Sequence, residues 1–281
     1  MKKRLKKALI ISVVLAMTVG MTACGSKSSE ENKNNEKKTI KIGSIAYNQD
    51  EVLVEPAVEK LKEEGYEVES LVFENATVMN EAIQEGSLDA TLHEHKPFLD
   101  AYNESKGTDL VMLKPYVHYN QFSLLSDKYK KVEDIPEGAD IVVSDDSANQ
   151  ARGLLFLQEL GLIKLTDGVE FPTTLDIVEN PHNFKITVVA HHQVVKSLPD
   201  VDAALTSTFL LYSNGGTKDE IVATSDDLNQ YGVGFVVAKK NADSDWAKAL
   251  AEAYGTKEAS DAIGKIFNGG YVPGYGIKPA K

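Results

Sequence analysis

The sequence is poor in the residues and motifs from which enzyme sites are built. Cys24 is the only cysteine among 281 residues, so no disulfide can form within the chain. The sequence contains no G-x-S-x-G nucleophile turn and no phosphate-cradling glycine loop. The two glycines of Gly232-Val233-Gly234 are more typical of tight backbone packing within a strand. These absences favour a protein that is not an enzyme and needs no cofactor.

Positive charge is scarce beyond the first few residues. The chain has 30 Lys and Arg against 42 Asp and Glu, which gives a formal net charge of −12 at pH 7. Five of the basic residues lie within MKKRLKK at the start, and without them the formal charge is −17. A surface this acidic argues against nucleic acid or an anionic membrane surface as a partner.

The opening segment MKKRLKKALIISVVLAMTVGMTACGS predicts an export signal over residues 1–23. Its apolar run, Ala8 to about Val19, is too short to span a bilayer comfortably. Cys24 directly follows Met-Thr-Ala, which resembles a bacterial lipobox, and the alternative is an ordinary cleaved signal beside an incidental cysteine. We therefore expect lipidation of Cys24, a flexible polar tether over 24–38, and a domain held on the extracytoplasmic side of a bacterial membrane.

From Thr39 onward, alternating patterns predict an α/β protein with parallel strands. The expected strands are Lys38 to Tyr47, Glu67 to Phe73, Ala90 to His95, Ala139 to Asp145, Phe184 to Ala190, Val201 to Ser207 and Tyr231 to Lys240. The expected helices end at Gly65, run from about Asn75 to Gly86, run from an N-cap at Ser147 to Gly161, and cover Asp243 to Phe267. Two such lobes imply a cleft, with the ligand at the carboxyl ends of the strands.

Arg152 is the strongest single candidate for ligand binding. We place it in the first turn of the helix that follows Asp145, where the helix dipole favours an anion and disfavours a cation. A guanidinium in this position is expected to hold a ligand carboxylate, and the alternative is an internal ion pair with Asp145 or Asp146. Arg152→Ala is accordingly expected to abolish binding and to leave the fold intact.

The segment DATLHEHKPFL contains two histidines, one on each side of Glu94. In a strand, His93 and His95 point to one face, which allows either a metal site or a pocket wall, while Glu94 turns into its own lobe. His191 and His192 are adjacent, so on a strand they add at most one further ligand. Since no other ligands follow at a convincing spacing, we favour the pocket wall over a metal site and over a purely structural role for the histidines.

Several longer stretches resemble the methionine-binding lipoprotein family (NlpA/MetQ type) over about Ile40 to Tyr275. They are GSLDATLHEHKPFLDAYN, VHYNQFSLLSDKYKKVEDIPEGADIVVSDDSANQARGLLFLQELGLIKL, TTLDIVENPHNFKI, KSLPDVDAAL and FNGGYVPGY. The resemblance implies a two-lobed periplasmic-binding-protein fold of type 2 that closes over an amino acid and delivers it to an ABC permease with its ATPase. We expect one lobe to comprise residues 39–124 together with 226–281 and the other to comprise 125–225, and we expect the lobes to close by hinge motion near Leu124 to Ser126 and Thr224 to Asp227.

The resemblance further implies a set of pocket positions, some of which depart from the family pattern. The family's pocket histidine and arginine match His95 and Arg152, and His118 matches a histidine frequent in the family. At other positions the family's residues are replaced: two of its asparagines fall on Ser207 and Phe209, and its pocket phenylalanine falls on His93. The full expected set is Arg152, His95, His93, Phe73, Ala76, Phe98, His118, Asn149, Ser207, Phe209 and Val233.

These departures predict a small carboxylate-bearing ligand other than plain L-methionine, such as a modified or different amino acid or a short peptide. Loss of two or three polar partners would weaken methionine binding by orders of magnitude, because each unpaired group costs about 1–3 kcal/mol. Two alternatives stay open. One is a metal-ion receptor that uses His93, His95, His118 and an acidic residue, and the other is a surface lipoprotein with a vestigial cleft.

Overall fold

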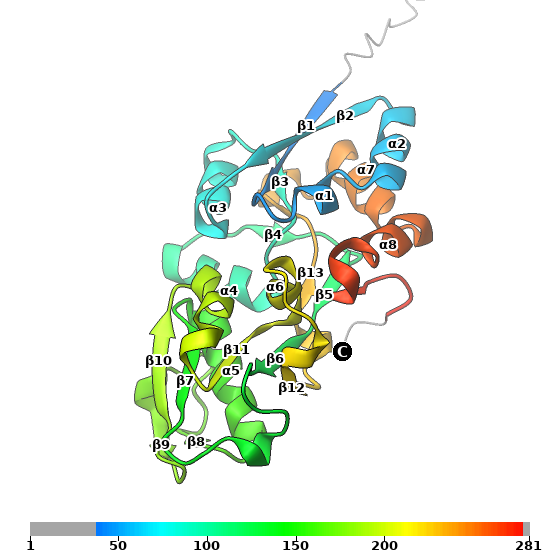
Figure 1. The fold of residues 1–281 in the computed structure, drawn as a ribbon. Coiled ribbons are helices and arrows are strands. Elements are labelled where there is room, and N and C mark those ends of the chain that lie inside the picture. Colours follow the sequence, from blue (N-terminus) through cyan, green and yellow to red (C-terminus); the bar gives the residue numbers. More distant parts are fainter. Residues whose placement is uncertain (1–37, 278–281) are drawn as a thin grey trace, which may run out of the picture. The chain divides into compact units, whose positions relative to one another are not determined.

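The computed structural model describes residues 38–277, which include two five-stranded sheets (Figure 1). The expected signal over 1–23, the lipidation site Cys24 and the tether up to residue 37 lie outside the described residues. Among the residues described, no helix has the length and apolar character that a membrane crossing requires.

The first sheet is built mainly from the amino-terminal part of the chain. β1 pairs in parallel with β2 and β3, and β14, which comes from much later in the sequence, pairs antiparallel with β3 and β4. The strands in spatial order are β2 Tyr66–Val72, β1 Lys38–Ser44, β3 Ala90–Thr91, β14 Val236–Val237 and β4 Val111–Met112. The parallel pairing of the first three strands confirms the prediction of a βαβ arrangement.

The second sheet is contiguous in sequence. β7 pairs in parallel with β10 and β11, while β6 and β12 run antiparallel at the other edge. Its strands in spatial order are β10 Lys185–Val189, β7 Asp140–Ser144, β11 Ala203–Ser207, β6 Phe122–Leu125 and β12 Ile221–Thr224. A separate pair is β8 Lys164–Leu165 with β9 Ile177–Glu179.

A small third sheet lies on the chain segments that pass between the two larger ones. It contains β13 Gly232–Val233, β5 His118–Asn120 and β15 Tyr271–Pro273. The chain passes from β5 to the second sheet through Gln121, and it returns from β12 through residues 225–231. The expected hinge at Leu124 to Ser126 therefore begins inside β6, and the lobe bounds and hinge motion remain predictions.

The helices cover the sheets, and their ends follow local sequence signals. α3 begins after Asn75, whose side chain accepts a hydrogen bond from the Val78 amide at 3.0 Å, and it ends at Gly86 with a φ of 80°. Both ends confirm the prediction. The helices are α1 Gln49–Val52, α2 Glu55–Glu63, α3 Ala76–Glu85, α4 Lys96–Lys106, α5 Ser147–Glu159, α6 Thr208–Ser213, α7 Asp245–Tyr254 and α8 Lys257–Ile263.

Three predicted elements are wrong in detail. The strand expected to reach His95 ends at Thr91, because His95 caps α4 and Pro97 lies in the first turn of that helix. The N-cap of α5 is Asp146, whose carboxylate accepts the Asn149 amide at 2.9 Å, so Ser147 is the first helical residue. The strand expected over Tyr231 to Lys240 is two short strands, β13 and β14, in different sheets.

Gly232 and Gly234 explain this split and confirm the prediction of tight backbone packing. A Cβ added at Gly234 would lie 2.5 Å from the Leu113 carbonyl oxygen, and one at Gly232 would lie 2.2 Å from the Tyr116 ring. The chain can therefore pass from β13 to β14 here only because Gly232 and Gly234 have no side chain.

We expect Gly234→Ala to lower the free energy of unfolding by about 1–3 kcal/mol, because backbone atoms must move to admit the methyl group. Urea denaturation followed by circular dichroism measures this change. The matched control is Gly153→Ala in α5, where the new Cβ would meet its nearest neighbours at an ordinary 3.4 Å. That variant should be as stable as the parent or slightly more so, since alanine favours a helix.

Candidate functional site

A cavity of about 610 Å³ lies where the parallel strands of both large sheets end. Its walls follow the carboxyl ends of β1, β2 and β3 on one side and of β7, β10 and β11 on the other. The lining residues are Ile45, Tyr47, Glu74, Asn75, Ala76, Thr77, Val78, His93, Glu94, His95, Phe98, Asn120, Asp145, Asp146, Asn149, Ala190, His191, His192, Ser207 and Phe209. Both the position and the volume suit a small organic ligand.

The structure brings most of the expected site residues to this cavity. Those in its lining are Ala76, His93, His95, Phe98, Asn149, Ser207 and Phe209. Four others, Arg152, Phe73, His118 and Val233, are not in the lining. Phe73 packs on the cluster around Met79, and Val233 is fully buried in β13 with a backbone bridge to His95.

His95 connects the two sides of the cavity. Its Nδ1 accepts a hydrogen bond from the Phe98 amide at 3.2 Å, so the ring hydrogen is on Nε2, which donates to Asn149 Oδ1 at 3.0 Å. Asn149 in turn donates to the Asp146 carboxylate. Burial, and then the nearby charge of Arg152, lowers the pKa of His95 to about 4, so the ring is neutral at physiological pH.

Three further histidines, His93, His191 and His192, line the cavity. Burial, and next His191, lowers the pKa of His93 to about 3, and burial lowers the pKa of His191. His191 and His192 lie in a 3-10 turn, His191–Gln193, and not on a strand, so both reach the lining. Within the described residues, no three His, Cys, Asp or Glu side chains are placed to hold a metal ion. The geometry gives the metal-receptor alternative no support.

Arg152 lies deeper than expected. It is the sixth residue of α5, in the second turn, and its side chain is 1% exposed. The guanidinium is paired with Asp227, which accepts from Nε at 2.8 Å and from Nη2 at 2.6 Å. The internal partner is therefore Asp227, and not Asp145 or Asp146. The guanidinium also stacks on Tyr231, with Cζ 3.4 Å from the ring centroid.

Asn120 joins this buried arginine to the cavity. It lines the cavity, and its backbone carbonyl accepts from Arg152 Nη2 at 2.9 Å. Within residues 38–277, neither Arg152 Nη1 nor Asn120 Oδ1 has a hydrogen-bond partner, although both atoms are buried. Buried polar atoms without partners are uncommon in native proteins and often mark binding sites.

His118 belongs to a second buried group behind the cavity wall. Its Nε2 lies 2.6 Å from Glu51 Oε1, and both side chains are fully buried. The His118 ring stacks on Tyr271 at 3.8 Å between centroids, and Tyr271 stacks on Phe209, a lining residue, at 4.5 Å. His118 therefore supports the wall and does not line it.

Sequence reasoning missed several lining residues. Tyr47, Glu74 and Asn75 follow the carboxyl ends of β1 and β2, and Asp146 follows β7. The carboxyl-end rule, applied to each predicted strand, would have found them. Glu94 was expected to turn into its own lobe, and its carboxylate does accept a hydrogen bond from Asn80 of α3, but the residue also lines the cavity.

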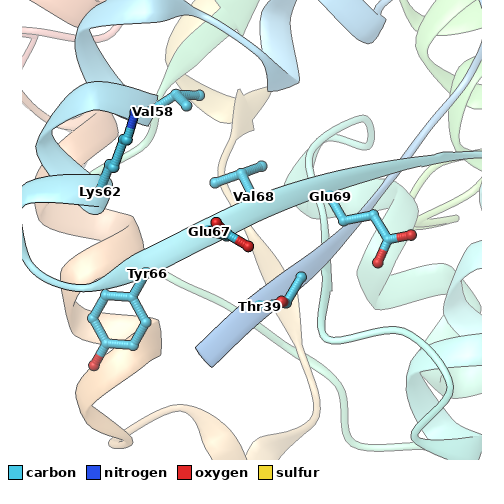
Figure 2. Close-up of a pocket in the computed structure, with 7 residues that line it drawn as sticks. All are labelled: Thr39, Val58, Lys62, Tyr66, Glu67, Val68 and Glu69. Carbon is cyan, nitrogen blue, oxygen red and sulfur yellow. The ribbon is translucent and has the colours of Figure 1, made fainter. Parts of the chain in front are cut away.

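A second hollow, of about 500 Å³, lies at the other end of the first sheet. Figure 2 shows the seven residues that line it. Thr39 and Tyr66 to Glu69 lie at the starts of β1 and β2, and Val58 and Lys62 come from α2. It contains no expected site residue. Because parallel sheets bind ligands at the carboxyl ends of their strands, the first cavity is the candidate site.

The two sheet orders, their parallel strands and a cavity at the strand ends define a two-lobed periplasmic-binding fold. Comparison with known proteins gives the family. The sequence profile of the NlpA lipoprotein family matches residues 40–275, and the chain belongs to this family. The resemblance seen in the sequence is thereby confirmed.

Named relatives agree with this assignment. The D-methionine-binding lipoprotein MetQ of Salmonella typhi is 36% identical over 95% of this chain and 96% of its own length. The crystal structure of the methionine binding protein MetQ is 34% identical with a TM-score of 0.76, and covers 84% of this chain and 98% of its own. A nutrient binding protein from Burkholderia cenocepacia bound to methionine is 32% identical with a TM-score of 0.77, and covers 83% and 99%.

Proposed function

We propose that this protein is the substrate-binding subunit of an ABC importer, lipid-anchored through Cys24 on the extracytoplasmic side of the membrane. It binds a small carboxylate-bearing ligand in the 610 Å³ cavity and delivers it to a permease that works with a cytoplasmic ATPase. In this role the protein is not an enzyme. Membership of a family with methionine-binding relatives supports the proposal.

The observation that carries the proposal is the buried guanidinium edge beside the cavity. Arg152 Nη1 has no hydrogen-bond partner within residues 38–277, and Asn120 contacts both the guanidinium and the cavity. A ligand carboxylate that displaces the Asn120 side chain gains a charge-assisted hydrogen bond from Nη1. Because Asp227 already neutralises much of the arginine charge, this contact is weaker than with a free guanidinium.

The lining supports a ligand other than plain L-methionine. Ser207, Phe209 and His93 occupy the wall where the resemblance leads us to expect asparagines and a phenylalanine. The polar groups of methionine would then lose two or more partners, at about 1–3 kcal/mol each. An amino acid with a more polar side chain, or a short peptide, fits this wall better.

Mass spectrometry of the small molecules that co-purify with the protein, followed by titration calorimetry, tests the function. We expect a carboxylate-bearing compound to co-purify and to bind tightly, and L-methionine to bind at least about 100-fold more weakly, as loss of two partners implies. Sub-micromolar L-methionine binding would leave the transport role in place and overturn the ligand choice. A thermal-shift screen in which no small carboxylate stabilises the protein would favour the vestigial cleft, since ligands that bind only the folded state raise its melting temperature.

A further inference from the structure

Glu94 lines the cavity and carries a buried acceptor atom. The residue is 4% exposed, and its Oε2 accepts a hydrogen bond from Asn80 Nδ2 at 3.1 Å. Its Oε1 has no hydrogen-bond partner in the described part of the chain, residues 38–277. Asn80, which is fully buried on α3, therefore holds one oxygen in place, while no described residue donates to the other. A carboxyl arranged in this way is suited to accept from a ligand.

The charges of the lining favour a cation at this point. Its carboxyl groups are those of Glu74, Glu94, Asp145 and Asp146, and among the residues described no lysine or arginine belongs to the lining. His93 and His95, the two histidines next to Glu94 in the sequence, supply no compensating charge, because burial lowers the pKa of His93 to about 3 and of His95 to about 4. Low-dielectric walls of one sign concentrate ligands of the opposite sign.

We propose that Glu94 Oε1 binds a primary ammonium group of the ligand and that Asn80 positions the Glu94 carboxylate for this contact. The site then selects amino acids and amines over carboxylic acids that carry no nitrogen. The inference rests on the proposed function of the same cavity, to which it adds a second recognition point. An ammonium group carries three N–H donors, which suits it to acceptors in a wall that has no basic side chain.

The proton on Glu94 links this contact to pH. Burial raises the pKa of Glu94, the hydrogen bond from Asn80 lowers it, and the result is a pKa of about 8. The carboxyl is therefore protonated in the ligand-free protein at neutral pH. A lysine-type ammonium, with a pKa of about 10.4, binds the ionised form and so displaces that proton. Burial, and after it the charges of Glu81 and Glu94, raises the pKa of Tyr102 on α4 above its usual value of 10.0. His93 and His95 are already neutral. None of these three groups titrates between pH 6.5 and 8.

Four six-carbon probes test the inference by calorimetry: L-lysine, L-norleucine, hexanoate and hexylamine. At pH 8 we expect the tightest ammonium-bearing probe to bind the parent protein at least about 10-fold more tightly than hexanoate, as a charged hydrogen bond implies. Glu94→Gln should weaken that probe by about 10- to 100-fold and leave hexanoate unchanged. In the parent, L-lysine affinity should rise about 10- to 30-fold from pH 6.5 to 8, and in the variant it should stay flat.

The matched control is Glu85→Gln, the same substitution at an exposed position on α3 outside the cavity lining, where we expect less than about a 3-fold change. Equal binding of hexanoate and L-norleucine, unaffected by Glu94→Gln and by pH, would overturn the ammonium contact and leave the proposed function standing. Binding of hexylamine without any carboxylate probe would overturn the proposed carboxylate site and keep the ammonium contact. Failure of all four probes to bind would overturn both.

Discussion

Replacing Arg152 with alanine is expected to lower the free energy of unfolding by about 3 kcal/mol, in addition to abolishing ligand binding. The guanidinium is 1% exposed and pairs with Asp227 through two hydrogen bonds, and removal of one partner of a buried pair typically costs about 3–5 kcal/mol. The Asp227 side chain is 19% exposed, which places the cost at the lower end of this range. Urea denaturation and a binding titration of the same samples measure both effects.

The sequence alone leads us to expect that Arg152→Ala leaves the fold intact, whereas the buried ion pair leads us to expect a loss of stability. Asp227→Asn separates the two roles of the arginine, because it removes the internal carboxylate charge and leaves the guanidinium in place. We expect this variant to be less stable than the parent but to bind carboxylate ligands at least as tightly. Parent-like stability of Arg152→Ala, within about 1 kcal/mol, would show that the buried pair contributes little.

The second large effect is expected at Glu51 and His118, the fully buried pair behind the cavity wall. His118→Ala leaves the Glu51 carboxylate without its partner at 2.6 Å and removes the ring that stacks on Tyr271, so we expect a loss of about 3–5 kcal/mol. A double-mutant cycle with Glu51→Ala should show a coupling of about 1–3 kcal/mol, because each single variant already removes the contact between the two side chains.

His182→Ala is the matched control for this cycle. His182 also stacks on an aromatic ring, that of Phe184 at 5.1 Å, but it is partly exposed, whereas His118 is fully buried. We expect a loss below about 1 kcal/mol there. If the effects of Glu51→Ala and His118→Ala were simply additive, the two side chains would not act as a pair.

Local signals in the sequence predicted much of the fold. Asn75 and Gly86 delimit α3 because an N-cap side chain and a left-handed C-terminal residue act within a few residues of the helix. Longer patterns failed where the backbone changes partner. The apolar run after Tyr231 has the composition of one strand, but contacts of Gly234 with Leu113, far back in the sequence, divide it between two sheets.

The candidate site was predicted in outline because ligands of parallel sheets bind at the carboxyl ends of the strands, and residues that follow β3, β7 and β11 line the cavity. The partners of the buried charges were not predictable. Arg152 and Asp227 are 75 residues apart, and nothing in the local sequence distinguishes Asp227 from its neighbour Asp226. Sequence patterns also placed Glu94 on the far side of its strand, because they assumed an extended segment where the chain leaves the sheet after Thr91.

The interleaving of the chain between the sheets has a consequence for how the protein acquires its fold. All five strands of the second sheet are complete once residue 224 has been synthesised. In contrast, β3 and β4 have no strand between them until β14 at Val236–Val237 arrives, and β5 gains its second neighbour only with β15 at Tyr271–Pro273. Contacts of such long sequence separation form slowly. The segment that carries the second sheet, residues 122–224, is therefore expected to become protease-resistant first, while the first and third sheets stay open to cleavage until the last strands are added.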